Sequence, residues 1–76
     1  MTTSIYDNRQ NIFELQTALR KLQRTHKALP LINPDGYFGE ETTLAVIAAQ
    51  EFFGLPQTGE ADYETWRLLF ETYFEP

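Results

Sequence analysis

The sequence of 76 residues contains no cysteine and a single histidine, His26. Without cysteine, neither a disulfide framework nor a thiolate metal site is available, and the redox compartment stays undetermined. One imidazole is too few for a zinc site built on histidines within one chain. We therefore expect no metal site and no cofactor.

The sequence also lacks long apolar runs and has little positive charge. No run approaches the ~18 residues that a membrane-spanning helix needs, and residues 1–6 lack the basic and apolar regions of a secretory signal. The chain as written is thus expected to be cytoplasmic, or extracellular or in the cell wall if it is an excised module of a secreted protein. Six basic and eleven acidic residues give a net charge of -5, which repels nucleic acid and anionic membranes. Neither is an expected partner.

The length predicts one small domain, which we assign to residues 9–76. Residues 1–8 show no periodicity and are expected to form a flexible N-terminal segment. Asp7 and Gln10 have the spacing of a capping box at the start of a helix over about 9–25. The apolar residues of this helix recur at three- and four-residue spacing, namely Ile12, Leu15, Leu19 and Leu22.

A second helix is predicted from about Glu40 to Phe53, because Gly54 and Pro56 follow it as stop signals. Its expected buried face consists of Thr42, Ala45, Val46, Ala49 and Phe53. Leu44, Ile47 and Phe52 extend the apolar surface beyond that face. They contact loops and the third helix in one interpretation, and form an exposed binding patch in the other.

A third helix is predicted after Asp62, which can cap it, with Glu64 in its first turn. Its apolar stripe is Tyr63, Trp66, Leu69, Phe70 and Tyr73. We interpret this stripe as part of the core in the first place and as a binding surface only in the second. The predicted fold is therefore all-α, a compact three-helix bundle with long structured loops. Phe38 and Trp66 are expected near its centre.

Two connectors join these helices. In the first, Pro30 and Pro34 exclude a helix, and at least one of Leu29, Leu31 and Ile32 is expected to plug the core. A short strand-like pairing is the alternative for this stretch. The dipeptide Asp35-Gly36 predicts a tight turn. Beyond it, Phe38 should anchor the loop and Tyr37 should point elsewhere. In the second connector, Leu55 is an expected plug and Gly59 the chain reversal.

The sequence offers no convincing catalytic or metal-binding group. Glu40 and Glu41 are adjacent, so on a helix their side chains diverge by about 100° and cannot flank one bond. A calcium loop centred on Gly36 would put Leu31 at the first ligand position and Thr42 at the bidentate position, so this register fails. The chain is therefore not expected to be an enzyme.

An ordered set of residues resembles the peptidoglycan-binding domain of the three-helix type. The set is Leu15-Gln16, Leu19, Leu22, Asp35-Gly36-x-Phe38-Gly39-x-x-Thr42, Ala45-Val46, Gln50, Gly54-Leu55, Thr58-Gly59, Asp62, Thr65-Trp66 and Leu69. The resemblance covers about 12–70. It departs from the family pattern at Ala49, where an aromatic residue usually precedes the glutamine, and in its longer first connector.

The resemblance implies a non-catalytic module that holds an enzyme or cargo on peptidoglycan, with the glycan or the stem peptide as ligand and a linked or separate cell-wall hydrolase as a further partner. Such a site needs an aromatic face and amide or hydroxyl groups. The ligand-binding candidates are Tyr37, Gln16, Gln50, Tyr63 and Arg67. For both glutamines the alternative is a hydrogen bond to a loop backbone. The alternative function is a protein-interaction module, including a weak homo-oligomer, that uses the surplus apolar residues.

Overall fold

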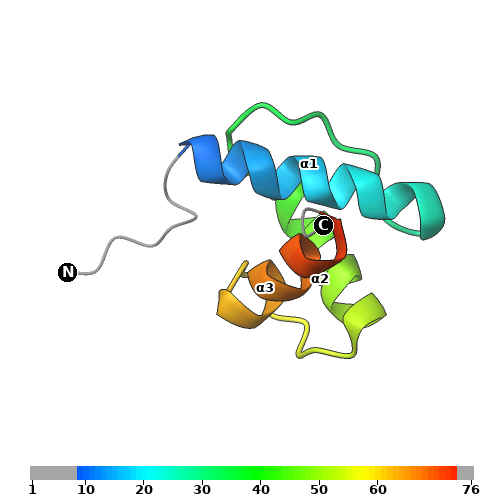
Figure 1. Cartoon of the computed structure of the whole chain (residues 1–76). Helices are drawn as coiled ribbons and strands as arrows, with labels where there is room; N and C mark the ends of the chain where they lie inside the picture. The colour runs from blue at the N-terminus through cyan, green and yellow to red at the C-terminus, as the bar shows by residue number, and fades with distance from the viewer. Residues whose placement is uncertain (1–8, 74–76) are drawn as a thin grey trace.

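The computed structural model describes residues 9–73 and contains three helices in that range. They are α1 (Arg9–Thr25), α2 (Glu40–Phe53) and α3 (Tyr63–Tyr73), as Figure 1 shows. The predicted bounds of the first two helices and the start of the third are confirmed. No strand forms within 9–73, so the all-α prediction is confirmed and the strand-like alternative is wrong for this range. Asp7 and the segment 1–8 lie outside the described residues.

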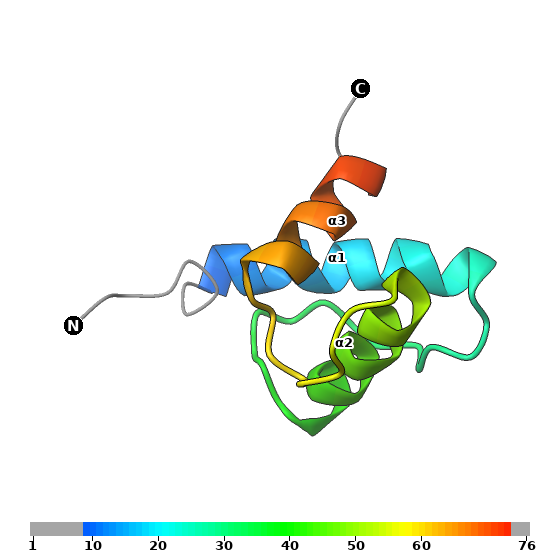
Figure 2. The same cartoon turned by 90° about the horizontal axis from the view of Figure 1, so that it is seen from below.

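The three helices pack against one another in a small bundle, in which each helix contacts both of the others. The longest helix, α1, lies along one side, and α3 crosses it steeply in Figure 2. The first connector, residues 26–39, runs back alongside α1 to the start of α2 (Figures 1 and 2). Among the described helices, none is long and apolar enough to cross a membrane.

The centre of the bundle is aliphatic. Its largest fully buried apolar side chains are Leu15, Leu19, Leu22, Val46 and Leu69, contributed by all three helices. Phe38 and Trp66, which were expected at the centre, are partly buried and pack against this cluster from its edge. Buried aliphatic side chains from the three helices and the connectors occupy the centre instead.

The buried face of α2 follows the prediction in part. Thr42, Ala45, Val46 and Ala49 are buried, and the small side chains let neighbouring helices approach closely. Phe53 is only partly buried, and Gln50 is buried in addition. The residues expected on the outer face of α2 differ in exposure. Leu44 and Phe52 are about half exposed, whereas Ile47 packs beside the second connector, residues 54–62.

The buried face of α3 differs from the predicted stripe. Thr65 and Leu69 are fully buried, whereas Tyr63 is 70% exposed. At about 100° per residue, Tyr63 lies some 160° around the helix from Thr65 and faces away from the core. Trp66 and Phe70 stack with ring centroids 4.7 Å apart at the edge of the core. The side chain of Tyr73 is outside what the structure describes.

The helix ends follow the predicted signals. Gly54 adopts the left-handed conformation that ends α2, and its N–H bonds the last carbonyls of that helix. The carboxylate of Asp62 accepts a hydrogen bond from the N–H of Thr65 at 3.0 Å, which confirms the cap of α3. In the first connector, Leu29 and Ile32 are each 2% exposed and plug the core, while Leu31 lies at the surface.

Candidate functional site

The side chain of Gln16, on α1, holds the turn that precedes α2. Its Oε1 accepts hydrogen bonds from the backbone N–H groups of Asp35 and Gly36, at 2.8 and 2.9 Å. Its Nε2 donates to the Asp35 carboxylate at 3.1 Å, and to the Tyr37 carbonyl and the Thr42 hydroxyl at 2.9 Å each. One buried amide therefore fixes the turn and the first turn of α2 to α1.

Gly36 is required at the turn that Gln16 holds. Its φ is 79°, in the left-handed region that disfavours residues with a Cβ. A Cβ at this position would also lie 3.3 Å from the backbone oxygen of Arg9, which has little freedom to move away. The predicted role of the Asp35-Gly36 turn is therefore confirmed.

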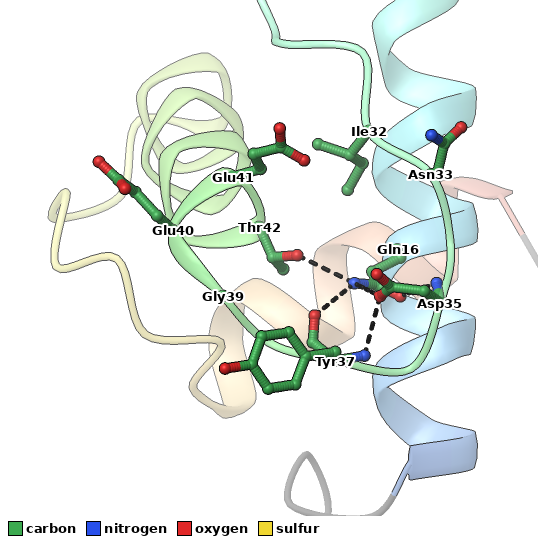
Figure 3. A pocket seen from close by; sticks show the side chains of 9 residues that line it. All are labelled: Gln16, Ile32, Asn33, Asp35, Tyr37, Gly39, Glu40, Glu41 and Thr42. Atoms are coloured by element: carbon green, nitrogen blue, oxygen red, sulfur yellow. Dashed lines mark hydrogen bonds between the residues drawn. The ribbon is translucent and has the colours of Figure 1, made fainter.

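Tyr37 leaves this turn with its side chain exposed. The side chain is 72% exposed, as the sequence predicts for the neighbour of an inward-facing Phe38. The edge of its ring lies against Gly39, where an added Cβ would come within 3.1 Å of the ring atom Cε2. Figure 3 shows the ring projecting from the loop beside Gly39, on the opposite side of the turn from Asn33. The loop and Gly39 together give this ring a defined position.

Tyr37 borders a hollow of about 210 Å³ between the first connector and the start of α2, which we call the Tyr37 hollow. The residues that line it are Gln16, Ile32, Asn33, Asp35, Tyr37, Gly39, Glu40, Glu41 and Thr42 (Figure 3). The buried Gln16–Thr42 hydrogen bond belongs to its lining, as do Asp35, Glu40 and Glu41, although the Glu40 carboxylate points away from Gln16 and Thr42 in Figure 3. The hollow thus combines an aromatic ring with several groups that form hydrogen bonds.

The Asp35 carboxyl in this lining is held in its charged form. The backbone N–H of Tyr37 donates to it at 2.9 Å, and the Gln16 amide donates to it as well. These two donors, the Tyr37 N–H foremost, lower the pKa of Asp35 below its ordinary value of 3.8. Asp35 is therefore a hydrogen-bond acceptor at neutral pH and does not act as a proton donor.

The side chain of Gln50, on α2, holds the second connector in the same manner. Its Oε1 accepts a hydrogen bond from the Gly59 N–H at 3.0 Å. Its Nε2 donates to the Thr58 hydroxyl, the Glu60 carbonyl and the Thr65 hydroxyl, at 3.2, 2.9 and 3.0 Å. This buried amide ties the second connector and the first turn of α3 to α2.

The two arrangements form an internal structural repeat. In each, a helix glutamine bonds the N–H of a glycine with φ of 79°, and a threonine six positions after that glycine accepts from the same amide. The residues before the two glycines, Asp35 and Thr58, also match, because each accepts a hydrogen bond from the glutamine and from an N–H two residues ahead. Helix, loop and helix start are therefore built twice.

The five candidate ligand residues separate in the structure. Tyr37 is exposed at a hollow, whereas Gln16 and Gln50 are 1% and 0% exposed and bond the loops, which was the stated alternative for both. Both amides are buried and form hydrogen bonds to the connectors in this structure, and their contact with a ligand stays a prediction. Tyr63 and Arg67 do not line the Tyr37 hollow.

Arg67 is held by two carboxylates on its own helix. Its guanidinium lies 2.8 Å from a carboxylate oxygen of Glu64 and 2.9 Å from one of Glu71. These partners, the Glu64 hydrogen bond first, raise the pKa of Arg67 above its ordinary value. The side chain therefore serves as a bridge along the surface of α3 in this structure.

The sequence interpretation missed Asn33 and Asp35 as candidate ligand contacts, and treated Glu40 and Glu41 only as a solvated helix start. The hollow forms because the first connector folds back beside α2, and no local pattern encodes that approach. Within residues 9–73, no group of three or more histidine, cysteine, aspartate or glutamate side chains is arranged to hold a metal ion.

Comparison with known proteins agrees with the fold and with the ordered motif. Residues 8–69 match the family described as "Putative peptidoglycan binding domain". Neither the curated proteins nor the solved structures yield a match. The family match covers both glutamine-held connectors and most of the three helices. The chain belongs to this family of peptidoglycan-binding domains.

Proposed function

We propose that the protein is a non-catalytic module that binds peptidoglycan at the Tyr37 hollow. The observation that carries the proposal is the exposed Tyr37 ring on a loop where Gln16 accepts two hydrogen bonds and donates two, with a further one donated to Thr42 at the start of α2. Because this loop is already ordered in the free protein, less conformational entropy of the loop is lost when a ligand binds. Family membership supports peptidoglycan as the ligand.

The chemistry of the hollow suits a carbohydrate polymer. The face of an aromatic ring packs against sugar C–H groups, while hydroxyl and acetamido groups need nearby acceptors and donors. Tyr37 supplies the ring and Asp35 supplies a charged acceptor. Asn33 also lines the hollow, but its Oδ1 already accepts a hydrogen bond from the Arg20 guanidinium at 3.1 Å. Because the chain has a net charge of -5, binding rests on these directed contacts and should depend little on salt.

The proposal assigns no chemical step to the hollow. Glu40 and Glu41 are consecutive in the first turn of α2, so they diverge around the helix and do not face each other across one bond. The lowered pKa of Asp35 disfavours its use as a general acid. The role that fits is attachment: the module keeps a linked or separate hydrolase, or another cargo, on the cell wall outside the cell.

Retention on purified sacculi tests this function. The Tyr37→Ala variant should remain folded and lose most of the retention shown by the parent chain. Tyr63→Ala is the matched control, because Tyr63 is equally exposed but does not line the hollow. Equal loss in both variants, or no retention of the parent chain, would contradict the proposal. A steep decline of retention with rising salt would contradict the stated binding chemistry.

A second candidate function is association through the outer face of α2. Leu44 and Phe52 are 51% and 49% exposed and lie eight positions apart on one side of that helix. Ile47, expected to extend this patch, instead packs beside Gly59, which reduces its apolar area. The molecular mass of the particle in solution tests this function. Leu44→Glu should lower that mass if the outer face of α2 forms a homo-oligomer, and should leave it unchanged otherwise.

A further inference from the structure

A second hollow lies on the other side of the Asp35-Gly36 turn. It measures about 270 Å³ and is lined by Arg9, Gln10, Phe13, Asp35 and Gly36. We call it the Phe13 hollow. Asp35 lines both hollows, so the turn that Gln16 holds borders both of them. A ligand that passes over this turn meets both.

The Phe13 hollow repeats the chemistry of the Tyr37 hollow. Phe13 is a large apolar side chain on α1 that is 44% exposed. Polar groups surround it: Gln10 donates to Glu14 at 3.1 Å, and the Arg9 guanidinium donates to the Asp35 carbonyl at 3.3 Å. An aromatic ring with amide and charged neighbours is again a surface for a sugar ring.

We infer that the two hollows are subsites for two non-consecutive sugars of one glycan strand of peptidoglycan, with Tyr37 and Phe13 as the two stacking rings. This inference rests on the proposed function and specifies which part of the polymer is bound. A glycan strand repeats the same kind of ring along its length, so it can place one sugar on each aromatic side chain. Phe13 and Gln10 thereby become ligand-contacting residues.

The charge of the surface favours the glycan over the stem peptide. Asp35, Glu40 and Glu41 line the Tyr37 hollow, whereas Asp35 and the cationic Arg9 line the Phe13 hollow, so three carboxylates face one guanidinium over the two hollows. An unamidated stem peptide carries more carboxylates than ammonium groups, and like charges within a Debye length repel. The N-acetylglucosamine rings of the strand are uncharged, and the N-acetylmuramic acid rings are uncharged where their lactyl carboxyl is amide-linked to a stem peptide. They can use carboxylates as hydrogen-bond acceptors without that repulsion.

Titration with uncharged β-1,4-linked N-acetylglucosamine oligomers tests the two subsites. The four-ring oligomer should bind about tenfold more tightly than the two-ring oligomer, because it reaches the second stacking ring. Phe13→Ala should lower the affinity for the four-ring oligomer to that for the two-ring oligomer, and leave the latter unchanged. Tyr37→Ala should weaken both. A synthetic stem peptide with free carboxylates should not bind measurably.

One control variant and one comparison of ligands complete the test. The variant checks the two hollows, and the comparison separates this inference from the proposed function. Leu31→Ala removes a side chain that is 63% exposed but lines neither hollow, so it should leave both affinities unchanged. If the parent chain is retained on sacculi but binds the stem peptide and not the oligomers, the glycan assignment fails and the proposed function stands. Equal affinity for two and four rings, or equal weakening of both by Phe13→Ala, would overturn the two-subsite arrangement. No retention on sacculi would overturn the proposed function itself.

Discussion

Gln16 and Gln50 occupy equivalent positions in two successive helix–loop–helix units. Each directs its side-chain oxygen to the N–H of a left-handed glycine and its nitrogen to a threonine in the next helix. The separation along the chain between glutamine and glycine is 20 positions in the first unit and 9 in the second. The longer first connector accounts for the presence of the Tyr37 hollow in the first unit.

Replacing Gln16 should destabilise the protein markedly. Gln16→Ala leaves the N–H groups of Asp35 and Gly36 without their partner and removes a donor from the buried Thr42 hydroxyl. Loss of such buried partners costs about 3 kcal/mol of unfolding free energy. Urea unfolding followed by circular dichroism measures it. Gln23→Ala, a partly exposed glutamine on the same helix, should change the stability by less than about 0.5 kcal/mol.

Gly59→Ala should destabilise more than Gly54→Ala. Both glycines have left-handed φ, near 79° and 74°, so both alanine variants carry a conformational penalty of about 1 kcal/mol. Only at position 59 would the new Cβ come within 3.1 Å of Thr43 Cγ2 and 3.3 Å of Ile47 Cγ1, whereas position 54 has open space. The difference between the two unfolding free energies isolates this contact. Equal destabilisation would show that the turn can move away from α2.

The charge of Asp35 should stabilise the fold at neutral pH. Because its pKa in the folded chain is lowered, its contribution is full above the unfolded value near 3.8 and is lost as the pH falls through the folded value. Asp35→Asn retains an oxygen for the Tyr37 N–H but removes the titration. The difference in stability between parent and variant should therefore shrink below pH 3.8. A difference that stays constant across that range would contradict the assigned hydrogen bonds.

Gly39→Ala should reduce ligand binding with little effect on folding. The backbone of Gly39 is extended, with φ of -112°, so alanine fits the chain conformation. Its Cβ would lie 3.1 Å from Cε2 of the Tyr37 ring, which must then shift. Retention on sacculi should fall while the thermal midpoint changes by only a few degrees. Unchanged retention would indicate that the ring position is not important for binding.

The sequence predicted the helices because their signals are local. The leucine spacing of α1, the stop at Gly54 and the cap at Asp62 each act within a few residues, and the structure confirms all three. The sequence left open whether Gln16 and Gln50 contact a ligand or bond a loop. A polar side chain is buried only where groups distant in the sequence form hydrogen bonds with it. Those partners are supplied by connectors that the helical periodicity does not describe.

The prediction that Tyr63 belongs to the core stripe of α3 was wrong for a related reason. Its spacing to Trp66 and Phe70 fits a helical stripe, but the buried face of α3 is set by Thr65, which bonds Gln50. Because threonine is polar, an apolar pattern does not select it as a buried residue. The observed buried face of α3 therefore differs in direction from the predicted one. The hollow itself depends on how the first connector approaches α2, which periodicity cannot reveal.

Amide chemical shifts of the isotope-labelled protein, followed during titration with solubilised peptidoglycan fragments, show which residues the ligand contacts. Binding at the turn held by Gln16 predicts the largest shifts at the backbone amides of residues 35–37 and 40–42, with little change along the outer face of α2 around Leu44 and Phe52. Shifts confined to that outer face, or no shifts at any fragment concentration, would contradict the account.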